Sequence, residues 1–154
     1  MTCYYLDASG LVKRYVDETG SQWLRRLVAS EPPQLLFTSR LTIVEVTSAF
    51  ARRVRDGTVS AADFTLVRDA FRADCLKDYR IIPPDLAVID RACQLLERYP
   101  LRAYDAIHLA TALNAQAFLA RKGYPSLTFI SSDQRLNGAA EMEGIEVADP
   151  NQHS

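Results

Sequence analysis

The sequence predicts an α/β protein, a three-layer α/β/α sandwich around a mainly parallel five-stranded sheet. Short apolar runs alternate along the chain with longer amphipathic segments. These segments are long enough to form the crossover connections that parallel neighbouring strands require. The 154 residues, 48% hydrophobic and 24% charged, have the size and composition of one globular domain. We expect this domain to span residues 1–148, followed by a C-terminal tail at 149–154.

Five short apolar runs are typical of buried strands. The first, CYYLD, ends on Asp7, and LTFIS lies two residues before Asp133. The predicted strands are 3–7, 35–39, 80–83, 127–131 and 145–148.

Seven segments between these strands have apolar residues at helical spacing. Gly57 and Pro100 stop two of the helices. Ser60 with Asp63 resembles a capping box at the start of another. The predicted helices are 10–16, 21–29, 41–55, 60–79, 85–99, 103–121 and 134–143.

The charged residues give a mixed signal about partners. The net charge of −1 does not indicate a polyanionic partner, yet 15 of the 18 basic residues are arginine. Arginine clusters suit phosphate, but on charge alone solvated helix faces are the favoured explanation. No apolar run approaches the ~20 residues of a membrane span, and Asp7 interrupts the first one too early for a signal peptide. We therefore expect a cytoplasmic protein without membrane association.

Four acids occupy positions where a carboxylate needs an explanation. Asp7 and Asp133 follow two predicted strands, and the carboxyl ends of parallel strands form the usual site of an α/β fold. Asp105 lies near the start of a long helix within the apolar run LRAYDAIHLA. Glu45 lies inside a helix between Val44 and Val46. Together they indicate one acidic pocket.

Each acid also has a structural explanation. Asp7 and Asp133 have the side chain that N-caps favour, and Asp105 would interact well with its helix dipole. Glu45 would form an ion pair with an arginine, for which Arg52, two turns along, is the nearest candidate. His108, one turn beyond Asp105, is expected to be packed and hydrogen-bonded rather than catalytic.

A shared acidic pocket would need a cation. Two carboxylates ~5 Å apart repel by roughly 3 kcal/mol at an effective dielectric constant near 20. Sites made only of carboxylates favour hard cations, Mg²⁺ or Mn²⁺, which support chemistry on phosphates. Such a metal activates water and stabilises the charge that develops on a phosphodiester.

Four segments carry a resemblance to a known family. YLDASGLVKRY, VEVTSAFARR, LRAYDAIHLATAL and ISSDQRLNGAAEMEGI, in this order, resemble PIN-domain proteins, above all the VapC toxins of type II toxin-antitoxin systems. The resemblance extends from Tyr5 to about Val147. The most specific pieces are DAIHLATAL and the run from Asp133 to Gly144. Ser132 departs from the family, in which an aromatic residue is common at that position.

The resemblance implies an endoribonuclease with a Mg²⁺ or Mn²⁺ site. By position, Asp7, Glu45 and Asp105 match the first three acids of the family, and Asp133 matches the variable fourth. Asp7 and Asp105 would be the primary metal ligands, and Glu45 and Asp133 would complete the site. The resemblance also implies a tRNA or rRNA substrate, a homodimer and a cognate VapB-like antitoxin, without naming the RNA or the antitoxin. Candidates for phosphate contacts are Arg14, Arg40, Arg52 and Arg53.

Three other functions can be compared with the sequence. A PIN-fold module that binds RNA or a partner without cleaving is the main alternative. A haloacid-dehalogenase-like phosphatase needs a second acid where the chain has Ser9. A receiver domain needs a lysine after a late strand, but the only lysines are Lys13, Lys77 and Lys122. The retention of all four acids favours the nuclease.

Overall fold

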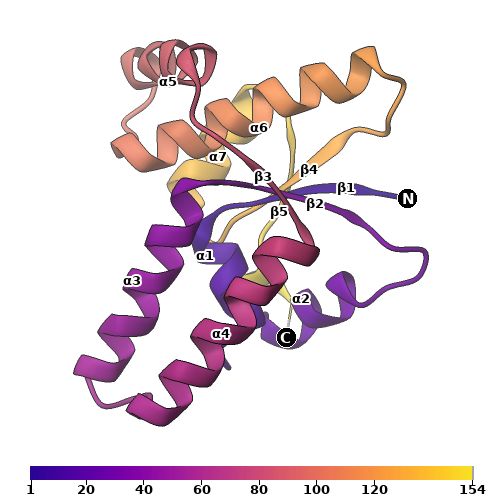
Figure 1. Ribbon diagram of the computed structural model, residues 1–154. Helices are drawn as coiled ribbons and strands as arrows, with labels where there is room; N and C mark the ends of the chain where they lie inside the picture. The colour runs from indigo at the N-terminus through magenta and orange to yellow at the C-terminus, as the bar shows by residue number, and fades with distance from the viewer. Residues whose placement is uncertain (154) are drawn as a thin grey trace.

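The computed structural model describes residues 1–153 and confirms the predicted α/β/α sandwich (Figure 1). The sheet has the strand order β3-β2-β1-β4-β5, and every neighbouring pair is parallel. It is therefore wholly parallel, whereas the sequence predicts a mainly parallel sheet. The strands are β1 (Cys3–Leu6), β2 (Leu35–Ser39), β3 (Tyr79–Ile82), β4 (Leu127–Ile130) and β5 (Glu146–Ala148).

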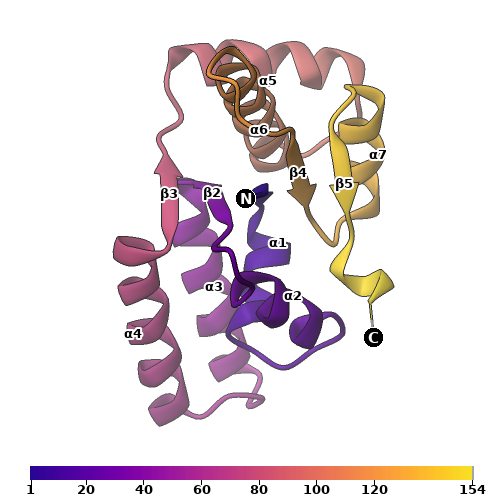
Figure 2. The same cartoon turned by 90° about the vertical axis from the view of Figure 1, so that its right-hand side faces the viewer.

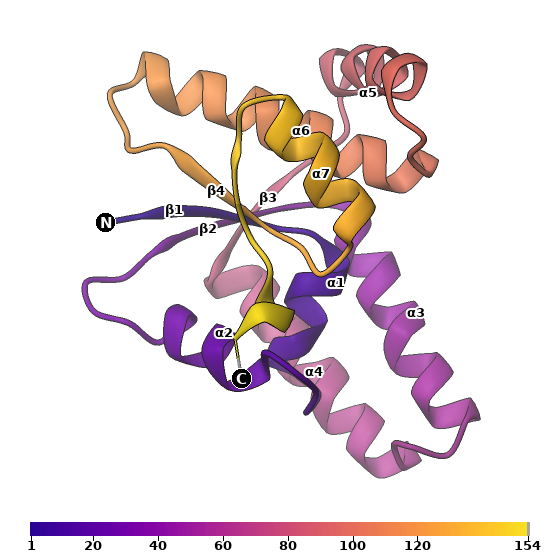
Figure 3. The ribbon, with the colours of Figure 1, turned by 180° about the vertical axis from the view of Figure 1, so that it is seen from behind.

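Helices cover both faces of the sheet. The first four pack on one face and the last three on the other, as Figures 1 and 3 show from opposite sides. Two short 3₁₀ turns, η1 (Val12–Arg14) and η2 (Pro150–Gln152), complete the fold. The helices are α1 (Ala8–Leu11), α2 (Ser21–Val28), α3 (Leu41–Arg55), α4 (Ala61–Lys77), α5 (Leu86–Arg98), α6 (Ala103–Arg121) and α7 (Gln134–Met142).

The alternation of side chains along β1 divides the interior into two cores. Cys3 and Tyr5 belong to the core shared with α5, α6 and α7. Leu6 points to the opposite face and belongs to the core shared with α1 to α4. Because both faces are covered, β1 and β4 are buried along almost their whole length. No helix within residues 1–153 is long and apolar enough to cross a membrane.

The region after β1 is held close to β4. The backbone N–H of Asp7 donates to the carbonyl of Ile130, 3.2 Å away. A Cβ atom added to Gly10 would lie 2.8 Å from the same carbonyl oxygen. Glycine at this position therefore lets α1 pack directly against the end of β4, which fixes where Asp7 lies.

The structure corrects the bounds of two predicted helices. The predicted helix 10–16 begins two residues earlier, because the Asp7 carboxylate caps it, and its second half is the 3₁₀ turn η1. The predicted helix 60–79 ends at Lys77, because buried Tyr79 begins β3 and pairs with Leu36. The predicted tail contains η2, and its His153 ring stacks on Trp23 at 4.3 Å between centroids.

The hairpin of α3 and α4 extends beyond the sheet (Figure 2). Along it, Val44, Leu66 and Leu76 are largely exposed.

Candidate active site

Asp7 lies at the carboxyl end of β1, buried to 3% exposure. Its carboxylate accepts hydrogen bonds from the Gly10 N–H (2.8 Å), the Ser9 hydroxyl (2.8 Å) and the Ser131 hydroxyl (2.7 Å). Burial raises the pKa of Asp7, against the opposing effects of His108 and these hydrogen bonds. Asp7 is thus both the N-cap of α1 and a buried carboxylate at the predicted edge of the sheet.

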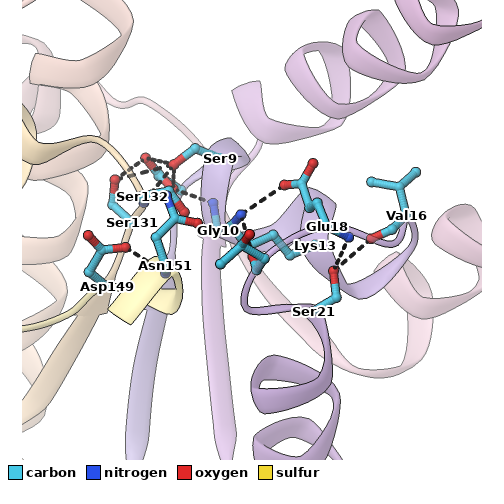
Figure 4. Close-up of polar contacts among 12 residues, drawn as sticks. Ser9, Gly10, Lys13, Val16, Glu18, Ser21, Ser131, Ser132, Asp149 and Asn151 are labelled. Atoms are coloured by element: carbon cyan, nitrogen blue, oxygen red, sulfur yellow. Dashed lines mark hydrogen bonds and ion pairs between the residues drawn. The ribbon is translucent and has the colours of Figure 1, made fainter. Parts of the chain in front are cut away.

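Three serines fix the surroundings of Asp7 (Figure 4). Ser131 follows β4, and its hydroxyl also accepts from the Asp133 N–H, 3.1 Å away. The Ser9 hydroxyl accepts from the Ser132 N–H at 3.0 Å. These bonds connect the chain after β1 to the chain after β4. They explain why Asp7 and Asp133 share one edge.

Asp105 and Asp133 share a cationic neighbour. The Arg102 guanidinium lies 3.6 Å from the Asp105 carboxylate and 3.8 Å from the Asp133 carboxylate. Burial, followed by the negative charges of Asp133 and Asp7, raises the pKa of Asp105, and Arg102 opposes this shift. Asp133 also caps α7 by accepting from the Leu136 N–H at 3.1 Å. The charges of Asp7 and Asp133 therefore both act on Asp105 at this edge.

Glu45 reaches the site through His108 rather than through an arginine. The Nε2 atom of His108 lies 2.6 Å from the Glu45 carboxylate, and its Nδ1 atom lies 2.8 Å from the Tyr5 hydroxyl. Burial lowers the pKa of His108, but the hydrogen bond and charge of Glu45 outweigh it, so the pKa is raised. The expectation that Glu45 pairs with Arg52 is wrong, because α6 places His108 closer.

The donor set of this edge fits a hard divalent cation. All four acids supply carboxylate oxygens, the ligands that Mg²⁺ and Mn²⁺ prefer. Within residues 1–153, however, no three acidic, histidine or cysteine side chains already lie close enough together to hold one ion. His108 engages Glu45, and Arg102 lies beside Asp105 and Asp133. The chemistry of the ligands fits a metal, and a cation would relieve the repulsion that Arg102 relieves here.

The four arginines predicted to contact phosphate lie in different places. Arg40 is exposed directly after β2, at the carboxyl edge. Arg52 and Arg53, near the end of α3, line a pocket with Ser9. Arg14 lies elsewhere. Its guanidinium pairs with Asp74 and Asp78 and bonds the Tyr79 hydroxyl at the amino end of β3.

Comparison with known proteins identifies the family. The model of the PIN domain matches residues 4–141. The chain belongs to the PIN-domain family. Ribonuclease VapC46 of Mycobacterium tuberculosis is 34% identical to this PIN domain over 150 residues, covering 97% of this chain and 99% of the relative. Ribonuclease VapC45 of the same species is 32% identical over 150 residues, covering 96% of each chain. The resemblance to VapC proteins is confirmed.

Solved structures share the fold of this PIN domain. VapC20 of Mycobacterium tuberculosis, described as a Sarcin-Ricin loop cleaving toxin, matches with a TM-score of 0.61 at 18% identity, covering 88% of this chain and 94% of that one. FitAcB from Neisseria gonorrhoeae matches with a TM-score of 0.62 at 17% identity, covering 96% and 97%. At these identities the matches confirm the PIN fold alone.

Sequence reasoning missed several residues of this PIN-domain site. Arg102 lies three residues before Asp105 and Ser131 two before Asp133, but only interatomic distances reveal what their side chains contact. His108 is packed and hydrogen-bonded, as expected, yet the partner of its ring is Glu45. The one available signal was that His108 follows Asp105 by one helical turn and therefore shares its face.

Proposed function

We propose that this VapC-like PIN-domain protein is a divalent-metal-dependent endoribonuclease, the toxin of a toxin-antitoxin pair. One observation carries the proposal: Asp7, Asp105 and Asp133 lie at one sheet edge, where burial and their mutual charges raise the pKa of Asp105. The relatives named Ribonuclease VapC, which match nearly the whole chain, support RNA as the substrate.

Asp7 and Asp105 would be the primary ligands of Mg²⁺ or Mn²⁺, and Glu45 and Asp133 would complete the site. The bound metal would supply an activated water and stabilise charge on the phosphodiester. The hydroxyls of Ser9 and Ser131 hold the Asp7 carboxylate in position. His108 holds Glu45 through a bond of 2.6 Å, as outer partners of metal ligands commonly do.

The substrate would be a structured cellular RNA, with tRNA or rRNA as the candidates. Arg40, Arg52 and Arg53 are near enough to the carboxyl edge, or to the pocket beside it, to contact phosphates. Arg14 is left out of this set, because two aspartates already neutralise it. An enzyme acting on such RNA would work in the cytoplasm.

The partner would be a VapB-like antitoxin, and the toxin itself would form a homodimer. Support for an antitoxin comes from structural neighbours described as a VapBC of Rickettsia felis bound to a promoter DNA fragment and a toxin-antitoxin complex from Klebsiella pneumoniae. The exposed apolar side chains on the α3–α4 hairpin offer a surface for such a partner.

Two measurements with wild type and the Asp105→Asn variant test the proposal. Wild type should bind Mn²⁺ by calorimetry and cleave purified total RNA into discrete fragments, and EDTA should stop cleavage. Asp105→Asn should lower cleavage by about 10²-fold or more, because a primary metal ligand loses its charge.

Asp90→Asn is the matched control, since Asp90 is exposed on α5, a helix that carries none of the four acids. Cleavage by folded Asp105→Asn at the wild-type rate would overturn the nuclease site. RNA binding by wild type without Mn²⁺ binding or cleavage would favour the alternative, a PIN-fold module that only binds.

A further inference from the structure

A polar pocket lies beside the acidic edge, and Arg102 does not line it. It has a volume of about 410 Å³ and lies between the η1 turn and the second half of α3. Ser9 and Ser132 line it, and Ser9 also bonds the Asp7 carboxylate. The pocket and the proposed metal ligands therefore share a wall.

Lys13 is the buried cation of this pocket. Its side chain is 5% exposed, and its Nζ atom donates to Glu18 at 2.9 Å and to the carbonyl of Thr19 at 2.8 Å (Figure 4). An ammonium group has three N–H donors. Within residues 1–153 Nζ has these two hydrogen-bond partners, which leaves one N–H without a protein acceptor.

The charges that line the pocket sum to a positive value. Lys13, Arg52 and Arg53 face two carboxylates, those of Glu18 and Asp56. Glu18 is shared between Lys13 and Arg53, whereas Arg52 has no ion-pair partner in the part of the chain that the structure describes. The surplus of one positive charge matches the single negative charge of a phosphodiester.

Ser132 supplies a further donor beside Arg52 and Lys13. Its hydroxyl oxygen is buried and forms no hydrogen bond within residues 1–153. Buried hydroxyls are usually satisfied, whereas this one loses no hydrogen bond when it rotates about χ1 toward the pocket that Ser132 lines. A phosphate oxygen is an acceptor of the right kind.

We propose that this pocket binds a backbone phosphate of the RNA strand next to the phosphate that is cleaved. Lys13 and Arg52 supply the charge, and the Ser132 hydroxyl supplies a neutral donor. The inference rests on the proposed function, because it places the scissile phosphate at Asp7. Because Ser9 lines this pocket and also bonds Asp7, the pocket lies next to the cleavage site along the RNA strand.

The test compares Arg52→Gln with Arg55→Gln. Both residues are exposed on α3, but only Arg52 lines the pocket. Binding of a short fluorescein-labelled single-stranded RNA is followed by anisotropy in EDTA, over a series of NaCl concentrations. Arg52→Gln should weaken binding about fivefold and reduce the salt slope by about 0.7, the value for one lost contact on a single strand. Arg55→Gln should leave the slope unchanged.

Ser132→Ala provides a second variant that should not disturb folding, because it removes a hydroxyl without a partner. It should weaken RNA binding while the melting temperature stays the same or rises. Equal salt slopes for wild type and Arg52→Gln would overturn the pocket assignment.

A substituted RNA locates the contact along the strand. One methylphosphonate, which carries no charge, replaces the phosphate next to a mapped cleavage site. Wild type should lose affinity for this RNA, and Arg52→Gln should lose no more than it already has. If the methylphosphonate and Arg52→Gln each lower the RNA affinity independently, then Arg52 does not contact that phosphate. Mn²⁺-dependent cleavage, compared between wild type and Asp105→Asn, tests the proposed nuclease function separately. A failure of the pocket assignment can therefore be distinguished from a failure of the nuclease proposal.

Discussion

Single residues at this site have two roles at once. Asp7 and Asp133 are the N-caps of α1 and α7, and both also lie at the acidic edge. The capping explanation holds for both residues, and capping is compatible with the catalytic role that we propose for them. A cap directs its carboxylate at the first turn of a helix that starts where the strand ends. Capping therefore places these carboxylates at the site.

His108 is the residue whose role can be tested most directly. Its two nitrogens contact different partners, Tyr5 at Nδ1 and Glu45 at Nε2. The amide of glutamine reaches about as far as Nε2, and the amide of asparagine about as far as Nδ1. His108→Asn should therefore lose the contact to Glu45 and lower RNA cleavage by about 10–100-fold, the usual effect of losing an outer partner of a metal ligand. His108→Gln should retain most of the activity.

Cleavage rates and Mn²⁺ affinities of the two variants, compared after both are shown to melt cooperatively, provide the measurement. Equal losses in His108→Asn and His108→Gln would show that His108 only fills space. In a Glu45→Gln background, His108→Asn should have little further effect, because the two residues act through one contact.

At the scale of elements, the site depends on how closely α1 approaches β4. β1 and β4 are neighbours in register, with Leu6 opposite Ile130. The chain that leaves β1 enters α1 at once, and Gly10 allows this helix to touch the Ile130 carbonyl. A strand-to-helix junction this short keeps Asp7 at the edge of the sheet.

Gly10→Ala and Gly138→Ala should have opposite effects on stability. The added Cβ at residue 10 would meet the Ile130 carbonyl oxygen at 2.8 Å, a backbone atom that cannot move freely. Overpacking of this kind destabilises by about 1–3 kcal/mol. At Gly138, within α7, an added Cβ meets nothing within 4 Å. Alanine there should stabilise by about 0.5–1 kcal/mol, since glycine is a poor helix former.

Urea unfolding of both variants beside wild type measures the two changes in the free energy of unfolding. Gly10→Ala should also reduce RNA cleavage, because Asp7 would shift with α1. A Gly10→Ala variant as stable as wild type would show that α1 can move without cost.

At the scale of the whole molecule, the acidic edge sets how stability depends on pH. Burial and the charges of Asp133 and Asp7 raise the pKa of Asp105, and burial raises that of Asp7. A carboxyl group with a higher pKa in the folded chain stabilises the fold while protonated. That stabilisation is lost as the pH rises through the folded pKa. Without divalent cations, wild type should therefore lose stability between about pH 4, the unfolded pKa of aspartate, and neutral pH.

Asp105→Asn should remove part of this loss, because its amide cannot ionise. In EDTA at neutral pH its melting temperature should exceed that of wild type, because the Asp105 carboxylate is then charged in wild type at a site that favours the neutral form. The difference should shrink near pH 4 and reverse when Mn²⁺ is present, since only wild type gains from binding. Calorimetric melts at several pH values, with Asp90→Asn as the exposed control, measure this difference in melting temperature. A difference that does not vary with pH would refute the electrostatic origin.

The sequence by itself determined the fold and the list of acids. Helices 41–55 and 103–121 have the predicted bounds, because long segments of good helix formers that end just before a glycine depend little on tertiary context. The placement of Asp7 and Asp133 at one edge was predictable, because the carboxyl ends of parallel strands always share an edge. The bounds of the short elements around Tyr79 and Gly10 were less predictable, because strand pairing and close helix packing determine where these elements begin and end.

Only the tertiary structure decided which side chains meet. Glu45 and His108 are 63 residues apart, and no local pattern indicates that α3 and α6 bring them within 2.6 Å. Arg14 and Arg52 look alike in the sequence, yet aspartates neutralise one and the other lines a pocket beside Asp7. Spacing along the chain determines which face of a helix a residue occupies. Contacts between residues distant in the chain depend on how whole helices pack, which the sequence pattern does not specify.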